Sequence, residues 1–134
     1  MVRYLLDTNI CIYLIKNRPY EVFEKFRQHA PKDVAVSSIT VFELEYGIEK
    51  SQHPAKSKKA LSKFLLPLNI IDFDENAASE AGKIRAALEK KGTPIGPFDL
   101  LIAGIARTMK LILVTNNTRE FSRVEKLRTE NWAG

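Results

Sequence analysis

The sequence predicts an α/β fold, with a parallel sheet built from repeated strand, helix, strand units. Two observations support this prediction: short runs rich in Val, Ile and Leu alternate along the chain with longer segments of helical periodicity. The chain has 134 residues, of which 45% are hydrophobic and 28% are charged. This length and composition suit one folded domain over residues 1–134, because single domains commonly contain about 100–150 residues.

Four segments are expected to form the strands of the sheet. Each is a short apolar run bounded by polar or turn residues, as is typical of strands buried on both faces. The expected strands are residues 3–7, 34–37, 70–73 and 111–115.

Five helices are expected between and after these strands, because apolar residues recur there at spacings of three and four. Their marker residues are Phe23 and Phe26; Val41, Leu44 and Ile48; Leu61, Phe64 and Leu65; Ala77, Ala81, Ile84 and Leu88; and Leu101, Ile102, Ile105 and Met109. Asp74 or Asn76 could cap the fourth helix at its start, and Gly92 could end it. The segment "GTPIGP" that follows is a loop, because its prolines and glycines prevent a continuous helix.

Charge and cysteine content indicate which classes of protein the sequence can belong to. The formal net charge is +5, and the basic residues occur in clusters that could be solvated helix faces or could attract a polyanion. The single cysteine, Cys11, excludes an intramolecular disulfide framework and is compatible with a reducing compartment. No membrane span or export signal is evident, so we expect a cytoplasmic protein that does not insert into membranes.

Acidic and amide side chains follow several of the expected strands. Asp7 ends the first strand, Glu43 lies on the helix after "SSIT", Asp99 follows Pro97, and "TNNTREF" follows the strand "LILVT". The carboxyl ends of parallel strands share one edge of a sheet, so these groups should gather there. Each also has a simpler explanation: Asp7 could be a helix cap, Asp99 a first-turn acid, and Glu43 a solvated helix residue.

Four motifs together resemble the PIN-domain ribonucleases. They are "LLDTN", "SSITVFELEYG", "GPFDLLIAGIA" and "LVTNNTREF", and their order and spacing are most similar to those of the VapC toxins of type II toxin-antitoxin pairs. The resemblance extends to the C-terminal "LRTENW". It implies a three-layer α/β/α PIN-like domain with a central parallel sheet, and an endoribonuclease that depends on Mg²⁺ or Mn²⁺.

The resemblance also implies site residues. Asp7, Glu43 and Asp99 match the family's metal-holding acids, and Asn117 stands where the family often has a fourth acid. Glu120 matches a further acid of the family. Because Asn117 adds no negative charge to the site, one bound metal is a safer expectation than two. Four polar residues have supporting roles. Thr115 and Asn116 would position the reacting groups, and Asn9 and Ser38 would tie neighbouring loops to the acidic rim, the sheet edge that carries Asp7, Glu43 and Asp99. Independently of the resemblance, oxygen ligands of this kind are those that hard cations prefer.

The implied partners are an RNA substrate, with tRNA suspected, and a small VapB-like antitoxin that blocks the active site and binds operator DNA. A homodimer is expected from the residues themselves, because Tyr46 and the run Phe64-Leu65-Leu66 provide more apolar surface than one small core covers.

Two other functions stay open at this point. A catalytically silent RNA-binding PIN module would explain the amide at position 117 and the basic surface. A metal-dependent DNA nuclease or phosphatase would share the acids at the sheet edge, although Asp7 is followed by Thr8 and Asn9 and lacks the Asp-x-Asp of haloacid-type phosphatases. Metal-dependent cleavage of a panel of RNA, DNA and small phosphoesters separates these functions.

Overall fold

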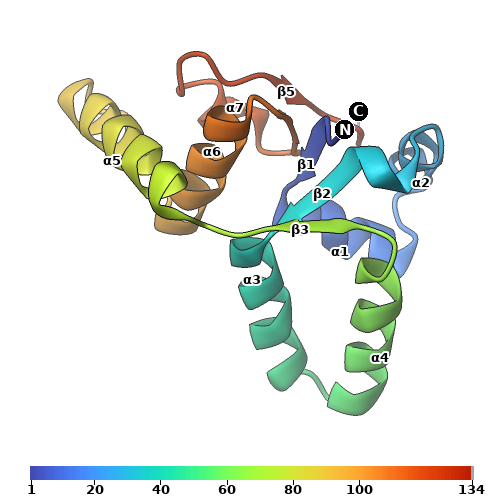
Figure 1. Ribbon diagram of the computed structural model, residues 1–134. Helices are drawn as coiled ribbons and strands as arrows, with labels where there is room; N and C mark the ends of the chain where they lie inside the picture. The colour runs from blue at the N-terminus through green and yellow to red at the C-terminus, as the bar shows by residue number, and fades with distance from the viewer. Residues whose placement is uncertain (134) are drawn as a thin grey trace.

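A five-stranded parallel sheet organises the chain. A computed structural model describes residues 1–133, and its strands are arranged in the order β3-β2-β1-β4-β5 (Figure 1). All four neighbouring strand pairs are parallel. The strands are β1 (Tyr4–Leu6), β2 (Val34–Ser37), β3 (Asn69–Ile71), β4 (Ile112–Val114) and β5 (Thr129–Glu130).

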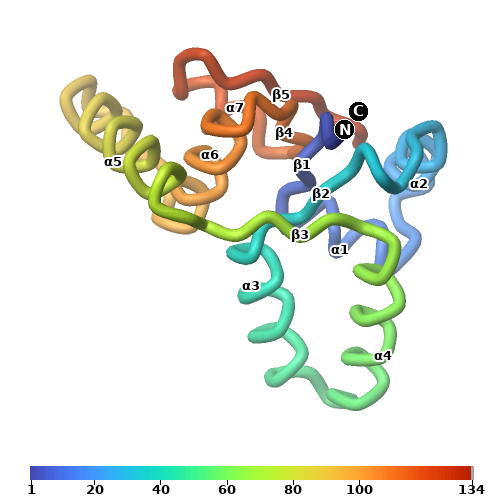
Figure 2. The backbone as a smooth tube through the Cα atoms, in the orientation of Figure 1, coloured from blue at the N-terminus to red at the C-terminus, as the bar shows by residue number. Residues whose placement is uncertain are grey.

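Helices cover both faces of this sheet, as the backbone trace shows (Figure 2). They are α1 (Thr8–Lys16), α2 (Tyr20–Arg27), α3 (Ser38–Glu49), α4 (Pro54–Leu65), α5 (Glu75–Lys90), α6 (Pro97–Met109) and α7 (Thr118–Phe121), with a 3-10 turn at Pro31–Asp33. One apolar cluster joins the sheet to α5 and α6, and a second joins it to α1 to α4. The predicted three-layer α/β/α architecture is therefore confirmed.

The strand side chains alternate between the two apolar clusters. Leu5 and Leu113 face α5 and α6, whereas Leu6, Val36 and Val114 face the helices of the other layer, and all five are fully buried. Because both faces of β1, β2 and β4 are covered, hydrophobic residues occupy every position of these strands except Ser37, which is the N-cap of α3. This explains why the strands appear in the sequence as continuous apolar runs.

The structure corrects the predicted elements in several places. The predicted strands 3–7, 70–73 and 111–115 are shorter or shifted, whereas 34–37 agrees with β2. Four further elements have no counterpart among the four predicted strands and five predicted helices: β5, α1, α7 and the 3-10 turn at Pro31–Asp33. The short β5 contains only Thr129 and Glu130 and has no apolar run to mark it. Helix α1 starts one residue after Asp7, inside an N-terminal apolar run that is interrupted only by Asp7, Thr8 and Asn9.

The fourth predicted helix, α5, has the predicted ends. Asp74 is its N-cap, and its Oδ1 accepts a hydrogen bond from the backbone N–H of Ala77 at 2.9 Å. At the other end Gly92 adopts a φ of +71°, a left-handed conformation that glycine tolerates without strain, and its N–H bonds to the carbonyl of Glu89. Within residues 1–133 no helix has the length and apolar character needed to cross a membrane.

Candidate active site

Asp7 lies where β1 ends and α1 begins, and its carboxylate is held from two sides. Oδ1 accepts a hydrogen bond from the backbone N–H of Thr8, and Oδ2 accepts one from the hydroxyl of Thr115, both at 2.8 Å. Only 5% of Asp7 is exposed, and this burial raises the pKa of its carboxyl group, although the two hydrogen bonds oppose the shift. Asp7 is thus both the N-cap of α1 and an oriented acid at the sheet edge.

Glu43 faces this edge from α3 and is linked to the segment after β1. Its Oε1 accepts a hydrogen bond from the Thr8 hydroxyl at 2.7 Å, and the same hydroxyl lies 3.0 Å from that of Thr40. The sequence analysis did not single out Thr8 or Thr40. The spacing of three residues between Thr40 and Glu43 could have indicated the second, since residues three apart share a helix face.

Asp99 occupies the first turn of α6, after Pro97. Its carboxyl pKa is raised to about 6, first by burial and then by the negative charges of Asp7, Glu120 and Glu43. Acids from three other segments are therefore close enough to Asp99 for their charges to act on it. Among residues 1–133, none of these four carboxylates forms an ion pair with a Lys or Arg side chain.

The segment after β4 supplies the positioning groups. The buried Thr115 hydroxyl donates to Asp7 and accepts a hydrogen bond from the backbone N–H of Asn117 at 2.9 Å. The Asn117 side-chain amide donates to Glu120 Oε2 at 3.2 Å, so these two residues act as a pair. Asn116 instead donates to the hydroxyl of Tyr13 at 2.7 Å and ties this segment to α1.

The two remaining predicted residues have different surroundings. The Ser38 hydroxyl accepts a hydrogen bond from the backbone N–H of Phe73 at 3.1 Å, which ties the segment after β3 to the start of α3. Asn9 is exposed, and its side chain forms no hydrogen bond with any residue in the described part of the chain.

The four acids are ligands of the chemical type that a hard cation prefers. Asp7, Glu43, Asp99 and Glu120 offer only oxygen, and the negative charges of the other three add to burial in raising the pKa of Asp99. Over residues 1–133, no three His, Cys, Asp or Glu side chains converge as a ready-made metal site. Mg²⁺ does not require such convergence, because it usually keeps several waters and binds one or two carboxylates together with substrate phosphate. The residues fit a divalent cation held partly through water.

Comparison with known proteins places this site in a family. The PIN domain family model matches residues 4–127, which include all four acids. The chain belongs to the PIN domain family. Among its PIN-domain relatives, the tRNA(fMet)-specific endonuclease VapC of Shigella flexneri is 50% identical over 133 residues, which cover 99% of this chain and 100% of that protein. Ribonuclease VapC2 of Haemophilus influenzae is 52% identical and covers 98% and 99% of the two chains.

Solved PIN-domain structures agree with the architecture. The crystal structure of DNA-bound VapBC from Salmonella typhimurium matches with a TM-score of 0.93 and 45% identity, covering 98% of this chain and 99% of that one. VapBC2 from Rickettsia felis, bound to a promoter DNA fragment, matches with a TM-score of 0.91, 41% identity and the same coverage. The resemblance to VapC that the sequence motifs indicate is confirmed, and the chain is similar to the VapC proteins over nearly its whole length.

Proposed function

We propose that this protein is the toxin of a VapBC-type pair and hydrolyses internal phosphodiester bonds of RNA with the help of Mg²⁺ or Mn²⁺. The observation that carries the proposal is a group of four acids, none of which pairs with a Lys or Arg side chain within residues 1–133. Burial, followed by the charges of the other three acids, raises the pKa of Asp99 to about 6. Asp7, Glu43 and Asp99 would hold the metal. A divalent cation bound there supplies charge neutralisation and a more acidic water.

The protein side chains orient the reacting groups. Asp7 is fixed by Thr8 and Thr115, so its free lone pairs have a defined direction toward the rim. Thr8 fixes Glu43 in the same way. Asn117 lies beside the acids with an amide that can direct a water or a phosphate oxygen, and it currently donates to Glu120. Such preset geometry lowers the barrier to attack on phosphorus because little reorganisation is needed.

We propose tRNA as the substrate class, which places the reaction in the cytoplasm. The support is the name of the relatives from Shigella flexneri and Salmonella typhimurium, each a tRNA(fMet)-specific endonuclease. With a 50% identity over 99% of this chain, the first of these relatives shares the whole domain and not the motifs alone.

We further propose a VapB-like antitoxin that blocks the rim and binds operator DNA. The support is that similar solved structures are VapBC complexes with DNA. A groove of about 560 Å³ between α1, α3 and α4 adjoins the site, with Ile12, Ile15 and Gly47 on its walls and Glu43 at its edge. An apolar segment of a partner could occupy this groove and place a basic side chain near the acids.

The decisive experiment tests cleavage of tRNA, single-stranded RNA, DNA and a small phosphoester, each with EDTA and with added Mn²⁺ or Mg²⁺. We expect cleavage of RNA only, abolished by EDTA and restored by metal. Asp7→Asn and Asp99→Asn should fold and lose activity, whereas Asn9→Ala, at an exposed position without hydrogen bonds, should retain it. RNA binding without cleavage would favour the silent module, and cleavage of DNA or of the phosphoester would favour the other alternative.

A further inference from the structure

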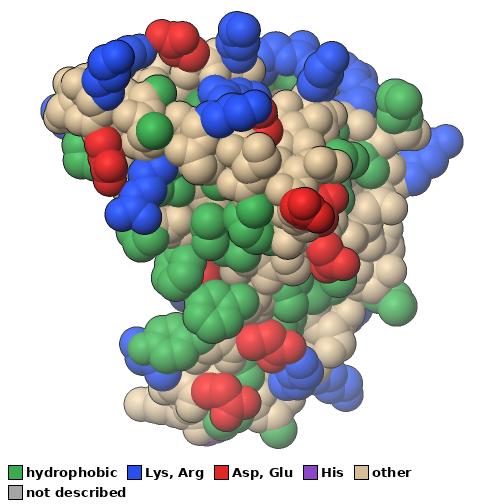
Figure 3. Space-filling view, turned by 60° about the vertical axis from the view of Figure 1, so that its left-hand side comes forward, with side chains coloured by type: hydrophobic (Ala, Val, Ile, Leu, Met, Phe, Trp, Pro, Cys, Tyr) green, Lys and Arg blue, Asp and Glu red, His purple; other side chains and the backbone are tan. Residues whose placement is uncertain are grey.

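A second groove, distinct from the acidic site, runs along α5 and α6 beneath the segment that joins α7 to β5. Its volume is about 1280 Å³. The cations on its walls come from three separate parts of the sequence. They are Lys83 on α5 and its C-cap Lys91, Arg107 on α6 and its C-cap Lys110, and three more from residues 123–128. In Figure 3, Lys and Arg side chains gather along the upper part of the molecule. We call this surface the α5–α6 groove.

The charge of the α5–α6 groove is strongly unbalanced. Its walls contain seven Lys and Arg side chains but only two acids, Glu80 and Glu125. The resulting excess of five equals the formal net charge of the whole chain, which is +5. The remainder of the protein is therefore close to neutral on average, and the positive field is concentrated on this face.

Both acids of the groove are already paired. Glu80 accepts a hydrogen bond from Arg107 at 2.7 Å and lies 3.5 Å from Lys83, while Glu125 pairs with Lys91 at 2.7 Å. Lys110, Lys126 and Arg128 are exposed and form no ion pair with any described residue. These three cations are available for an external anion.

The walls of the groove are held in place by the same contacts. Arg107 bonds to Glu80 on α5, and its second nitrogen donates to the backbone carbonyl of Glu125 at 3.2 Å. Arg107 thereby joins α6, α5 and the segment before β5. A ligand would meet a surface that is already assembled, which reduces the entropy lost on binding.

One wall of the groove contacts the loop that leads to the helix of Asp99. Arg123 donates to the carbonyl of Pro94 at 2.9 Å, and Pro94 lies in the loop that leads directly into the helix of Asp99. Arg123 also follows Glu120 by three residues. Arg123 thus joins one wall of the groove to the segments that carry Asp99 and Glu120.

We propose that the α5–α6 groove binds the phosphate backbone of the RNA substrate, on a stretch beyond the cleaved bond. This inference rests on the proposed function. None of the groove's lining residues is aromatic, so the groove has no platform on which bases could stack. Four of its large apolar lining residues are buried in the core: Ile84, Leu88, Leu111 and Val124. Only Leu127, which is partly buried, and the small Ala87 offer apolar surface to an acidic peptide. Phosphate contacts of this kind give affinity without sequence selection.

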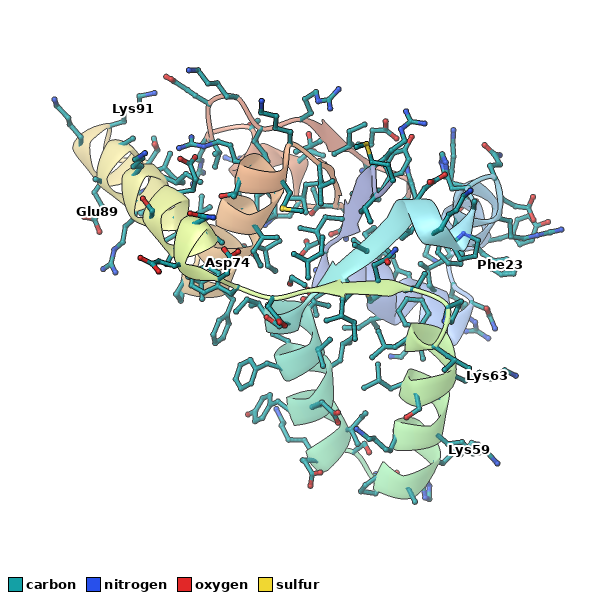
Figure 4. The ribbon with its side chains drawn as sticks, viewed as in Figure 1. Phe23, Lys59, Lys63, Asp74, Glu89 and Lys91 are labelled. Carbon is teal, nitrogen blue, oxygen red and sulfur yellow. The ribbon has the colours of Figure 1, made fainter. Side chains whose placement is uncertain are left out.

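Binding is tested with the triple variant Lys110→Gln, Lys126→Gln and Arg128→Gln. The control has the same charge change at exposed, unpaired residues on α2, the 3-10 turn and α4: Lys25→Gln, Lys32→Gln and Lys59→Gln. Figure 4 shows Lys59 on the outer side of α4, far from Lys91 at the end of α5. Fluorescence anisotropy with tRNA in EDTA over a salt series gives the affinity and its salt slope.

We expect the groove variant to bind tRNA at least tenfold more weakly, with a salt slope shallower by about two, because about 0.7–0.9 counterions are released per phosphate neutralised. The control should bind within about threefold of wild type at the same salt, since only the long-range field changes. Equal losses in the two variants would overturn the proposal, because net charge alone would then explain them. Binding of polyglutamate as tight as that of tRNA, lost in the groove variant, would also overturn it in favour of an acidic protein partner.

Cleavage separates this inference from the proposed function. With a short oligonucleotide that reaches only the rim, the groove variant should cut as wild type does, whereas with tRNA its KM should rise and its kcat should stay unchanged. A fall in kcat on both substrates would contradict the groove's role. If no RNA is cleaved by any form of the protein, the proposed function fails, and the anisotropy comparison still decides whether the groove binds RNA.

Discussion

At the scale of single residues, Asp99 is the most informative acid of the site. Burial and three neighbouring carboxylates raise its pKa from 3.8 to about 6, so the folded chain holds the Asp99 proton more tightly than the unfolded chain does. The stability that protonation contributes is fully present below the unfolded pKa and is lost as the pH rises through about 6.

We predict that metal-free wild type loses about 1–2 kcal/mol more free energy of unfolding than Asp99→Asn between pH 4.5 and 7.5. The estimate is below the full shift because Asp99 is only half-buried. Urea unfolding in EDTA at the two pH values measures the difference, which includes the coupling of Asp99 to the neighbouring acids. Adding Mn²⁺ at pH 7.5 should restore stability to wild type more than to Asp99→Asn. An equal pH dependence in the two proteins would show that Asp99 ionises as an ordinary surface acid.

Asn117 and Glu120 form a pair, which changes the expectation for the missing fourth acid. From the sequence alone, Asn117→Asp is favoured to tighten metal binding by restoring a charged ligand at the strand end. In the structure, however, Asn117 donates to Glu120 Oε2 at 3.2 Å, and the charge of Glu120 already acts on Asp99. An aspartate at position 117 would replace this donor with a second negative charge beside Glu120.

We therefore predict that Glu120→Gln weakens Mn²⁺ binding severalfold and that Asn117→Asp leaves the affinity unchanged or lower. Calorimetric titration of Mn²⁺ into wild type and both variants measures this directly, without reference to activity. Tighter binding by Asn117→Asp, together with no loss in Glu120→Gln, would identify position 117 as the fourth ligand site instead.

At the scale of elements, the close contact of α5 with α6 fixes the position of Asp99. Gly104 of α6 permits this contact, because a Cβ at that residue would lie 2.8 Å from the backbone carbonyl oxygen of Ala77 and 2.9 Å from the Cβ of Ala81. Gly82 of α5 offers a matched comparison, since a Cβ there would meet nothing within 4 Å.

We predict that Gly104→Ala lowers the free energy of unfolding by about 1–3 kcal/mol, because backbone and side chain must move apart. Gly82→Ala should raise it by about 0.5–1 kcal/mol, because alanine favours the helix. Thermal and urea unfolding of both variants test the pair. If Gly104→Ala were as stable as Gly82→Ala, the helices would not be in the contact that positions Asp99.

Elements with a strong apolar pattern could be predicted from the sequence, and those held by partners far along the chain could not. The strands β1, β2 and β4 are buried on both faces and therefore appear as apolar runs, whereas β5 is ordered by pairing with β4 and has no apolar signal. In the site, the motif acids could be identified, but the hydroxyl of Thr8 gains its role only when α3 brings Glu43 beside it, 35 residues away. Such contacts depend on tertiary packing and not on local pattern.

At the scale of the whole molecule, the proposed RNA-binding face and an exposed apolar patch are separate surfaces. The patch consists of Phe42 and Tyr46 on α3 and Phe98 on α6, which are 54%, 58% and 43% exposed. Phe42 and Phe98 meet edge to face, with ring centroids 5.5 Å apart. In Figure 3, hydrophobic side chains lie together on the lower half of the molecule with acidic ones nearby. Exposed aromatic groups of this kind often mark an interface.

The structure also refines which apolar residues remain for the expected homodimer. Phe64 and Leu65 are half-buried and pack against the core, so of the run on α4 only Leu66 stays largely exposed, at 86%. A single exposed leucine is common on protein surfaces, whereas three aromatic residues from two helices are not. The patch of Phe42, Tyr46 and Phe98 is thus the better candidate for a two-fold interface.

We predict that the protein alone is a dimer of twice its 15.2 kDa mass and that Tyr46→Glu shifts it toward the monomer. A two-fold axis places the same patch of both copies together, so one charge per chain introduces two like charges into a single apolar contact. Leu66→Glu adds the same charge outside the patch and should leave the dimer intact. Light scattering over a range of micromolar concentrations compares the three proteins. A monomeric wild type, or dissociation by Leu66→Glu and not by Tyr46→Glu, would show that the patch does not join two copies of this chain.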